Sequence, residues 1–433
     1  MYQLVSGLVL ASMLTSTLAF ADEAELNTRI QKLQQQLELQ TPMLQNLQSR
    51  VNALSEQQKK TADAQSSQAQ ASDALADTSI GGYGEIAYNN YANDSSRNMA
   101  DLKRFVLFLG HRFNEQLSFN SEVEWEHAVA SASDKGESEI EQLYLDYRLG
   151  QDINLKTGLF LMPFGLLNQS HEPPVFYGVE RNEIETRIIP STWREGGLGL
   201  SGSTDLGLAW DVGITTGFDV AKFDDASAPL AASHQELQFA KAHDLSYYGA
   251  LNYRGIPGFT VGGALFTGNS TQGNADFNVD QSQPSFAGIQ GRITLWDMHT
   301  RLQKNGWDLQ AVYAKGTIAE ADRIDAALLA FNNVNPGSRP YVPSAFYGWL
   351  VQGAYTVWQR GDMTVSPFIR YEEFNTQSEM PAGFAADLAN ADRVTTVGLT
   401  FKPHPQVVFK ADVQKYWDNP NNDRFNLGLG YMF

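Results

Sequence analysis

Short and long connections alternate along residues 80–433, and this alternation constrains the fold more than any other feature of the sequence. Short segments in which apolar and polar residues alternate are rich in aromatic residues and glycine. They are joined in pairs by very short turns, such as residues 114–116 and 203–205. Longer polar connections separate the pairs, and they include residues 162–193 and 318–343. The seven short turns and eight long connections predict about sixteen strands.

The sorting of the connections by length separates a membrane barrel from a soluble β-sandwich. A sandwich scatters its loop lengths over both ends, whereas an outer-membrane barrel has short periplasmic turns, long extracellular loops and strands of about ten residues. We therefore predict an all-β fold, a transmembrane antiparallel β-barrel of about 16 strands over residues 80–433. With an even number of strands, the first and the last strand both have their free chain ends on the periplasmic side.

The chain ends on a strand that is apolar on one face. Every second residue, read from the last position backwards, is apolar or aromatic, and the residues between are mostly small or polar. The apolar set is Phe425, Leu427, Leu429, Tyr431 and Phe433. A period of two is the mark of a strand with one buried face. In a barrel this face meets lipid, and the terminal aromatic residues join an interfacial girdle.

Residues 1–21 have the features of a secretory signal peptide. An apolar stretch is followed by Ala19-Phe20-Ala21, a small-x-small cleavage pattern. No Lys or Arg precedes the apolar stretch, so the amino terminus alone supplies positive charge there. The alternative is a short buried N-terminal helix. We expect cleavage after Ala21 and export of the protein.

Residues 22–60 carry a heptad pattern with alternating spacings of four and three. The seam consists of Leu26, Ile30, Leu33, Leu37, Gln40, Leu44, Leu47, Val51 and Leu54. Gln40 is a polar interruption, and the adjacent Thr41-Pro42 kinks or restarts the helix. We predict a periplasmic α-helical coiled-coil stalk, followed by a soft Ala/Gln/Ser-rich linker over residues 61–79. The alternative is an amphipathic helix packed on its own protein.

Composition excludes several classes of protein. The 433 residues include no cysteine, so disulfides and Cys-based metal sites are excluded. A net charge of -18 disfavours nucleic acid as a partner, because its phosphates would be repelled. After the first twenty residues, no apolar run approaches the length of a membrane helix.

The arrangement of signal, heptad segment, linker and barrel resembles the phosphate-selective porin O/P-like family. The first strand, GGYGEIAY, and the block GLFLMPFG…YGVERNEIETRIIPSTWREGGLGLSG carry this resemblance. The terminal aromatic strand also looks like the assembly signal of Gram-negative outer-membrane barrels. The resemblance implies a homotrimeric passive channel whose third loop folds inward and narrows the pore. Its implied partners are outer-membrane lipid, lipopolysaccharide and the barrel-assembly machinery.

Two patterns that are typical of enzymes have simpler interpretations here. The sequence GLGLSG, residues 197–202, fits the dinucleotide pattern G-x-G-x-x-G, but a loop precedes it and a turn follows it. We interpret it as a barrel strand, because a dinucleotide fingerprint needs a strand before it and a helix after it. The seven histidines form no metal pair such as HExxH. We expect no cofactor, no metal and no enzyme activity; the alternative is an outer-membrane hydrolase with a spatially assembled triad.

The long connection 162–193 supplies the candidate pore constriction. It is far longer than a turn requires, and long loops of this kind tend to be functional. Charges of both signs lie in it or directly after it: Glu180, Arg181, Glu183, Glu185, Arg187, Arg194 and Glu195. If the loop folds into the lumen, these charges create a transverse field and a size filter. The alternative is an external loop with a solvated cluster of ion pairs.

The alternation of the strands predicts further lumen charges and an ion preference. It places Glu122, Glu124 and Glu126 inside, and also Lys410 and Asp412. Other candidate lumen cations are Arg104, Lys156, Arg292, Arg370 and Arg393, which form no dense basic ladder. Anion pores use rings of basic side chains. We therefore predict passive diffusion of small hydrophilic solutes with a modest preference for cations. The alternatives are an anion- or phosphate-selective channel and a structural protein tethered to peptidoglycan by its stalk.

Overall fold

The computed structural model describes residues 27–35, 48, 55–56, 59–60, 77–128, 136–273, 283–335 and 339–433. Residues 27–35 are helical and belong to one compact unit, Met1–Ala76, while Asp77–Phe433 forms a second. The predicted signal segment, 1–21, lies outside the described residues, as do most of the stalk and of the linker. The coiled coil therefore stays a prediction.

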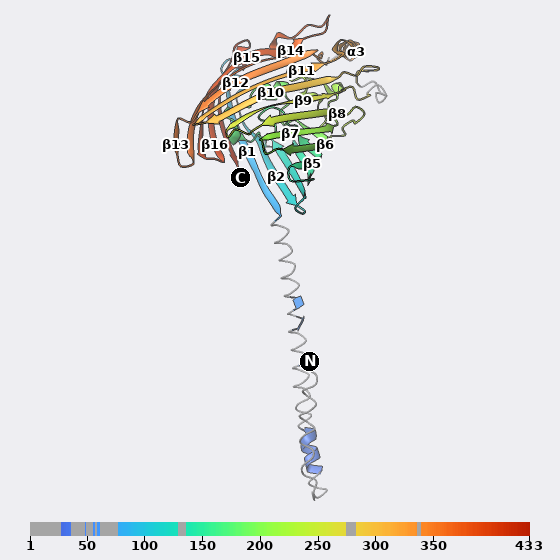
Figure 1. Ribbon diagram of the computed structural model, residues 1–433, viewed down its shortest axis with the longest axis vertical. Coiled ribbons are helices and arrows are strands. Elements are labelled where there is room, and N and C mark those ends of the chain that lie inside the picture. Colours follow the sequence, from blue (N-terminus) through green and yellow to red (C-terminus); the bar gives the residue numbers. More distant parts are fainter. Residues whose placement is uncertain are drawn as a thin grey trace. The chain divides into compact units, whose positions relative to one another are not determined.

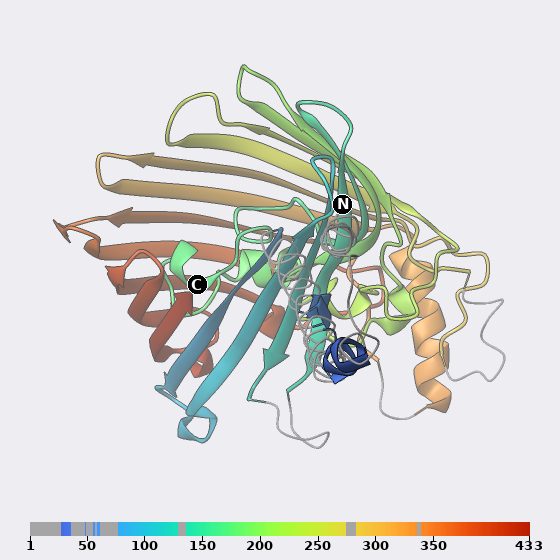
Figure 2. The same cartoon turned by 90° about the horizontal axis from the view of Figure 1, so that it is seen from below.

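The second unit is a single antiparallel sheet that closes on itself, with β1 paired to both β2 and β17 (Figures 1 and 2). Its strands are β1 (Thr78–Tyr91), β2 (Met99–Arg112), β3 (Leu117–Glu126), β4 (Ser138–Arg148), β5 (Ile153–Leu161), β6 (Arg194–Ser203), β7 (Leu208–Thr215), β8 (Ser246–Tyr253), β9 (Phe259–Gly268), β10 (Ile293–Lys304), β11 (Trp307–Ile318), β12 (Ala345–Tyr355), β13 (Trp358–Arg360), β14 (Met363–Glu379), β15 (Ala391–His404), β16 (Val407–Tyr416) and β17 (Arg424–Met432). Each strand pairs with its neighbours in the sequence, as in an up-and-down barrel.

The short strand β13 does not add a separate strand to the barrel wall. Both β12 and β13 pair with β14, so they are two parts of one interrupted strand. The described part of the chain therefore forms a sixteen-strand closed barrel from seventeen labelled strands. This confirms the predicted all-β antiparallel barrel. The sequence GLGLSG lies within β6, again as a strand.

Side chains alternate between the outer and inner faces of the barrel. In β16, Phe409 and Val413 are exposed on the outside, while Lys410 and Asp412 are buried on the inside. In β17, Phe425 and Leu427 are exposed, and Asn426 between them is fully buried. An apolar outer face over a polar inner face is the pattern of a barrel that spans a lipid bilayer. The backbone of Phe433 also exchanges hydrogen bonds with Gly82 in β1, which extends the closing seam to the last residue.

An apolar core fills part of the barrel interior. The Trp193 ring stacks on Phe218 at 5.2 Å between centroids and contacts Phe266 edge-on at 4.9 Å. Phe164 lies 4.8 Å from Trp193, and Ile184 and other apolar residues of the β5–β6 connection join the same cluster. Because these side chains come from long connections as well as strands, the connections are packed inside the barrel and fix one another there.

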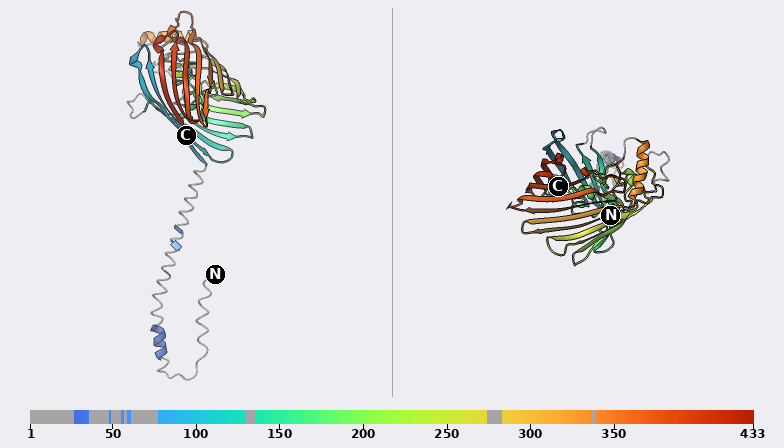
Figure 3. Two further views of the ribbon diagram at one scale, coloured as in Figure 1. Left: turned by 90° about the vertical axis from the view of Figure 1, so that its left-hand side faces the viewer. Right: turned by 90° about the horizontal axis from the view of Figure 1, so that it is seen from above.

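The long connections contain short helices. These are η1 (Ser95–Arg97), η2 (Pro173–Val175), the π-helical turn η3 (Ile184–Ile188), η4 (Val220–Lys222), η5 (Ala231–Ser233), α3 (Ala321–Val334), η6 (Leu388–Asn390) and η7 (Pro420–Asn422). Residues 318–343 connect two strands as predicted, but they are not an irregular loop, because α3 occupies about half of them (Figure 3). The helix buries Ile324 and Leu328. No described helix is long and apolar enough to span a bilayer.

Candidate pore constriction

The β5–β6 connection, residues 162–193, contacts the barrel wall far from its own strands. The Lys410 ammonium donates to the Gly178 carbonyl at 2.8 Å, and the Val179 amide donates to Asp412 Oδ2 at 2.6 Å. The Thr400 hydroxyl donates to the Tyr177 carbonyl at 3.0 Å. Lys410 and Asp412 belong to β16 and Thr400 to β15, which lie about half a turn of the sheet from β5 and β6. The connection is thus bonded to the inner face across the barrel.

Glu180 anchors this connection to β1 and β2. It pairs with Lys103 and accepts a hydrogen bond from Asn89 Nδ2 at 2.9 Å. Burial alone would raise the pKa of Glu180, but the charges of Lys103 and Arg424 outweigh it and lower the pKa to about 2. Glu180 is therefore ionised over the whole physiological range and ties the connection to β1 and β2.

Glu183 forms a second anchor, to β14 and β16. Its carboxylate accepts hydrogen bonds from the Tyr416 hydroxyl and from Arg187 Nε, the latter at 2.5 Å. Its backbone amide donates to Glu372 Oε1 at 2.7 Å. Burial opposes ionisation here too, but the charges of Arg187 and Arg424 keep the pKa of Glu183 below its usual value. The predicted charges Glu183 and Arg187 are thus paired with each other.

Glu185 and Glu195 have a different role from the predicted one. Glu185 accepts hydrogen bonds from the backbone amides of Leu166 and Leu167, at 2.5 and 2.7 Å. Glu195 accepts from Trp193 Nε1 at 3.1 Å and from the Gly217 amide at 3.0 Å. Both carboxylates are buried, and burial raises the pKa of Glu185. They hold the connections together and do not face a water-filled lumen, because they are buried and backbone and side-chain donors of the protein occupy their oxygens.

The two remaining predicted arginines lie at the edge of the connection. Arg194 pairs with Glu139 at 2.5 Å and with Glu236 at 2.9 Å. Arg181 donates to the hydroxyls of Ser191 and Thr192, at 2.6 and 2.8 Å, and no carboxylate of a described residue lies within ion-pair distance of it. Arg181 is therefore a half-buried guanidinium whose charge no described carboxylate neutralises directly.

An acidic strip faces the connection from β3 and β4. We define it as Glu122, Glu124, Glu126, Glu139 and Glu141. Arg104 of β2 lies 3.2 Å from Glu124 and 3.8 Å from Glu126. The field of Arg181 also reaches Glu124 and Glu126. This side of the lumen thus has five carboxylates and fewer cationic side chains.

The other predicted lumen residues are placed as follows. Lys156 pairs with Asp211 of β7 at 2.8 Å. Lys410 lies 3.4 Å from the centre of the Phe176 ring, a cation–π contact with the β5–β6 connection. Arg370 pairs with Glu372 inside the barrel. The prediction for Arg393 is wrong: it is exposed on the outer side and pairs with Asp418, because β15 alternates in the opposite phase. Arg292 is also exposed, directly before β10.

Two pockets flank the β5–β6 connection. One has a volume of about 360 Å³ and is lined by Arg148, Gln169 and Asp211, among others. The other has a volume of about 350 Å³ and is lined by Tyr177, Asp308 and Lys402, among others. Both linings include charged side chains of either sign, so space for small charged molecules exists on both sides of the connection.

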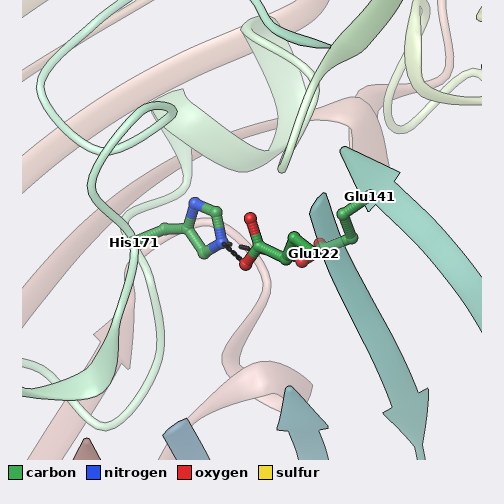
Figure 4. Close-up of side chains that lie close together, drawn as sticks. All are labelled: Glu122, Glu141 and His171. Atoms are coloured by element: carbon green, nitrogen blue, oxygen red, sulfur yellow. Dashed lines mark ion pairs between the residues drawn. The ribbon is translucent and has the colours of Figure 1, made fainter. Parts of the chain in front are cut away.

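Three residues of this region did not emerge from the sequence, namely Glu139, Glu141 and His171. Glu122 of β3 pairs with Gln142, while the next residue, Val123, pairs with Ile140, so Glu141 is the extra residue of a β-bulge. The bulge turns Glu141 inward beside Glu122 and opposite His171 (Figure 4). A period-two reading cannot find a bulge, because the bulge is the point at which the period breaks.

Comparison with known proteins supports this architecture. The sequence model of the family described as phosphate-selective porin O and P matches residues 81–193. An uncharacterized protein of Aquifex aeolicus strain VF5 is 32% identical over 361 residues, which cover 82% of this chain and 80% of the relative. The structure of Salmonella typhi OmpF in complex with daunomycin aligns with a TM-score of 0.54 at 14% identity, over 82% of this chain and 97% of that chain. An anion-selective porin from Comamonas acidovorans aligns with a TM-score of 0.48 at 11% identity, over 82% and 99% of the two chains. The likeness to OmpF shows a shared barrel fold.

Proposed function

Because this chain belongs to the phosphate-selective porin O and P family, we propose that it is an outer-membrane porin through which small hydrophilic solutes and ions diffuse passively. The observation that carries the proposal is the closed sixteen-strand barrel with exposed apolar side chains outside and charged side chains inside. Such an inner face suits water and solutes, whereas the outer face suits lipid. The proposal requires no covalent chemistry.

The β5–β6 connection narrows this channel from the inside. It is the third long connection of the barrel, and its anchors Glu180 and Glu183 hold it against β1, β2, β14 and β16. With the connection bonded to the far wall, solutes pass beside it. Charged groups at such a narrow passage act on ions more strongly than charges on outer loops, which salt screens within about 10 Å at ~0.1 M.

Ion selectivity is weak, with a modest preference for cations. The acidic strip supplies five carboxylates, and the cations beside it are Arg104, Arg181 and Arg194, whereas Lys103 on the same side is paired with Glu180. On the opposite wall, Lys402 and Lys410 donate to backbone carbonyls of the connection, so their ammonium groups are engaged. The described lumen contains no row of unengaged basic side chains of the kind that anion pores use.

The second candidate is an anion- or phosphate-selective channel, which the family description favours. Lys402 and Arg301 line the same pocket of about 350 Å³, which gives this candidate two cations in one place. Arg301 is already bonded to Asp308 at 2.6 Å, so the pocket carries little net positive charge. We therefore rank it second.

The experiment that decides between the two candidates is the reversal potential of the purified protein in a planar bilayer under a KCl gradient. We expect stepwise conductance and a small reversal potential whose sign corresponds to cation selectivity. Added phosphate should change this potential little. Replacing Arg181 by Ala should shift the potential further towards cations. A strongly anion-selective potential, with phosphate blocking the chloride current, would establish the second candidate. The absence of conductance steps would refute the channel itself.

The predicted assembly and partners are also proposals. The heptad seam needs partner helices. Three parallel chains, whose stalk helices associate with one another, form a homotrimer with closed rotational symmetry. The outer band contacts lipid and lipopolysaccharide, and the terminal strand is read by the barrel-assembly machinery. Peptidoglycan is a further candidate partner of the stalk.

A further inference from the structure

The cluster of Glu122, Glu141 and His171 contains buried acceptor atoms without donors. Among the described residues, nothing donates a hydrogen bond to Glu122 Oε1, to either oxygen of Glu141 or to His171 Nε2. All three side chains are at most 4% exposed. Buried polar groups almost always have a partner, and each one that lacks it costs about 1–3 kcal/mol. Four such atoms in one place point to a group that binds all of them.

The hydrogen bonds around the cluster orient its acceptors inward. His171 Nδ1 lies 3.1 Å from the Asn168 carbonyl, which can only accept, so Nδ1 carries the hydrogen and Nε2 offers a lone pair. Gln142 donates to Glu122 Oε2 at 2.6 Å, which leaves Oε1 for the cluster. A hydrogen bond from Nδ1 to a carbonyl is the usual support for a histidine that ligates a metal through Nε2.

The electrostatics are unfavourable without a cation. With its hydrogen on Nδ1, the imidazole directs the lone pair of Nε2 into the cluster. Its lone pair then faces two carboxylates, with Nε2 3.6 Å from Glu122 Oε1 and 3.9 Å from Glu141 Oε2 (Figure 4). Acceptors at these distances repel one another unless a cation lies between them.

We propose that Glu122, Glu141 and His171 bind a divalent transition-metal cation of the Zn²⁺ class. One imidazole nitrogen and two carboxylates are ligands that such ions take in proteins. Ligands around one tetrahedral ion, at bonds of about 2.1 Å, lie about 3.4 Å apart. The present separations of 3.6 and 3.9 Å need to close by only a few tenths of an ångström. Imidazole favours Zn²⁺ over Mg²⁺ and Ca²⁺, which prefer oxygen ligands.

A neighbouring group of carboxylates is the weaker candidate. Glu124, Glu139 and Glu141 also lie close together. However, Glu124 lies 3.2 Å from the Arg104 guanidinium, and Glu139 pairs with Arg194 at 2.5 Å. Two of its three members thus already have cationic partners. In the first cluster no Lys or Arg of the described residues lies within ion-pair distance of Glu122 or Glu141, so its carboxylates remain available to a metal ion.

The site has a structural consequence for the barrel. Glu122 and Glu141 belong to β3 and β4, whereas His171 belongs to the β5–β6 connection. A metal ion would therefore tie this end of the connection to β3 and β4, beside the strand β2 to which Glu180 is anchored. Gln142, which supports Glu122, also lines a pocket of about 290 Å³ with Lys156 and Gln169, so this pocket lies beside the site.

The test is metal binding by the full-length protein, purified in detergent without a histidine tag. Zn²⁺ is titrated and counted per chain, and Co²⁺ is used as a spectroscopic stand-in for the ligand set. We expect one Zn²⁺ per chain, with little competition from Mg²⁺. Glu141→Gln and His171→Gln should each weaken binding by at least about tenfold. Asp146→Asn, which removes another inward carboxylate of β4, should leave binding unchanged.

Each other outcome refutes the site. No stoichiometric Zn²⁺ in the wild type, or full binding by Glu141→Gln and His171→Gln, would overturn it. If the wild type binds no metal and Glu141→Gln is more stable than the wild type, the carboxylates share a proton instead. Heat-dependent gel mobility reports whether each variant has folded, and Glu122→Gln replaces any variant that has not. Metal counting needs no conductance, so its failure and that of the proposed channel are distinguishable.

Discussion

The anchoring of the β5–β6 connection by Glu180 leads to a quantitative prediction. Replacing Glu180 by Gln keeps an acceptor for Asn89 but removes the ion pair with Lys103. The fall of the pKa of Glu180 from 4.5 to about 2 corresponds to roughly 3 kcal/mol of stabilisation. The side chain is 18% exposed, so solvent screening reduces this to about 2 kcal/mol. We expect the connection to open about 30-fold more often in the variant.

Hydrogen exchange followed by mass spectrometry measures this opening. The relevant peptides cover residues 176–189, and exchange is expressed as protection factors so that intrinsic rates cancel. Glu172→Gln is the matched control, because it removes a carboxylate from the same connection that has no ion pair among the described residues. We expect protection to fall in Glu180→Gln and to stay at the wild-type level in the control.

The pH dependence has a defined sign. The pKa of Glu180 is lower in the folded state than in the unfolded state, so its stabilisation is complete above about pH 4.5 and is lost as the pH falls towards about 2. The difference between wild type and Glu180→Gln should therefore shrink in acid. Equal protection of the two proteins at neutral pH would refute the anchoring, and so would a difference that persists undiminished near about pH 2.

Three further predictions concern other parts of the molecule. Asp325→Asn should raise the protection of α3 against hydrogen exchange by about 1–2 kcal/mol at neutral pH. The reason is that burial raises the pKa of Asp325 to about 7, so the ionised acid destabilises the folded state. The gain should vanish below about pH 4, where the acid is protonated in the unfolded state as well. Trp193→Ala should weaken protection of the connections by about 3–5 kcal/mol while the strands stay paired, since its ring is fully buried among Phe164, Phe218 and Phe266. Deleting residues 22–60 should lower the melting temperature of the trimer but leave the barrel folded; trimers of unchanged stability would make the stalk a spacer or a tether.

The sequence predicted the barrel well because its determinants are local. Turn length and a period of two both depend only on residues that are close together in the sequence. They predicted the strand number and the inward position of Glu122 and Lys410. The α-helix α3 was missed because it lies inside a long connection, where polar and apolar residues alternate less regularly. Arg393 was misplaced because its strand was assigned the wrong phase, and a shift of one residue exchanges the two faces of a strand.

The candidate site was less predictable, because two β-bulges shape it. One lies at Glu141; the other lies at Lys103, where Glu85 pairs with Arg104 and Ile86 pairs with Leu102. Each bulge turns one additional charged residue towards the lumen, and each of these residues contacts the β5–β6 connection or lies beside it. The roles of Glu185 and Glu195 were equally hidden, since their partners are backbone amides and side chains whose positions depend on the packed connections.

The seam between β1 and β17 has a consequence for how the protein folds. Asn89 and Asn426 meet across it with a hydrogen bond of 2.7 Å, although 337 residues separate them in the chain. Contacts between such distant residues form late and slowly, because the loop-closure entropy is lost before they can form. Until the last strand is made, β1 and β16 each present an unpaired edge that can capture another chain. A truncation of only a few residues at Phe433 therefore threatens the yield of folded barrels more than the stability of those that have closed.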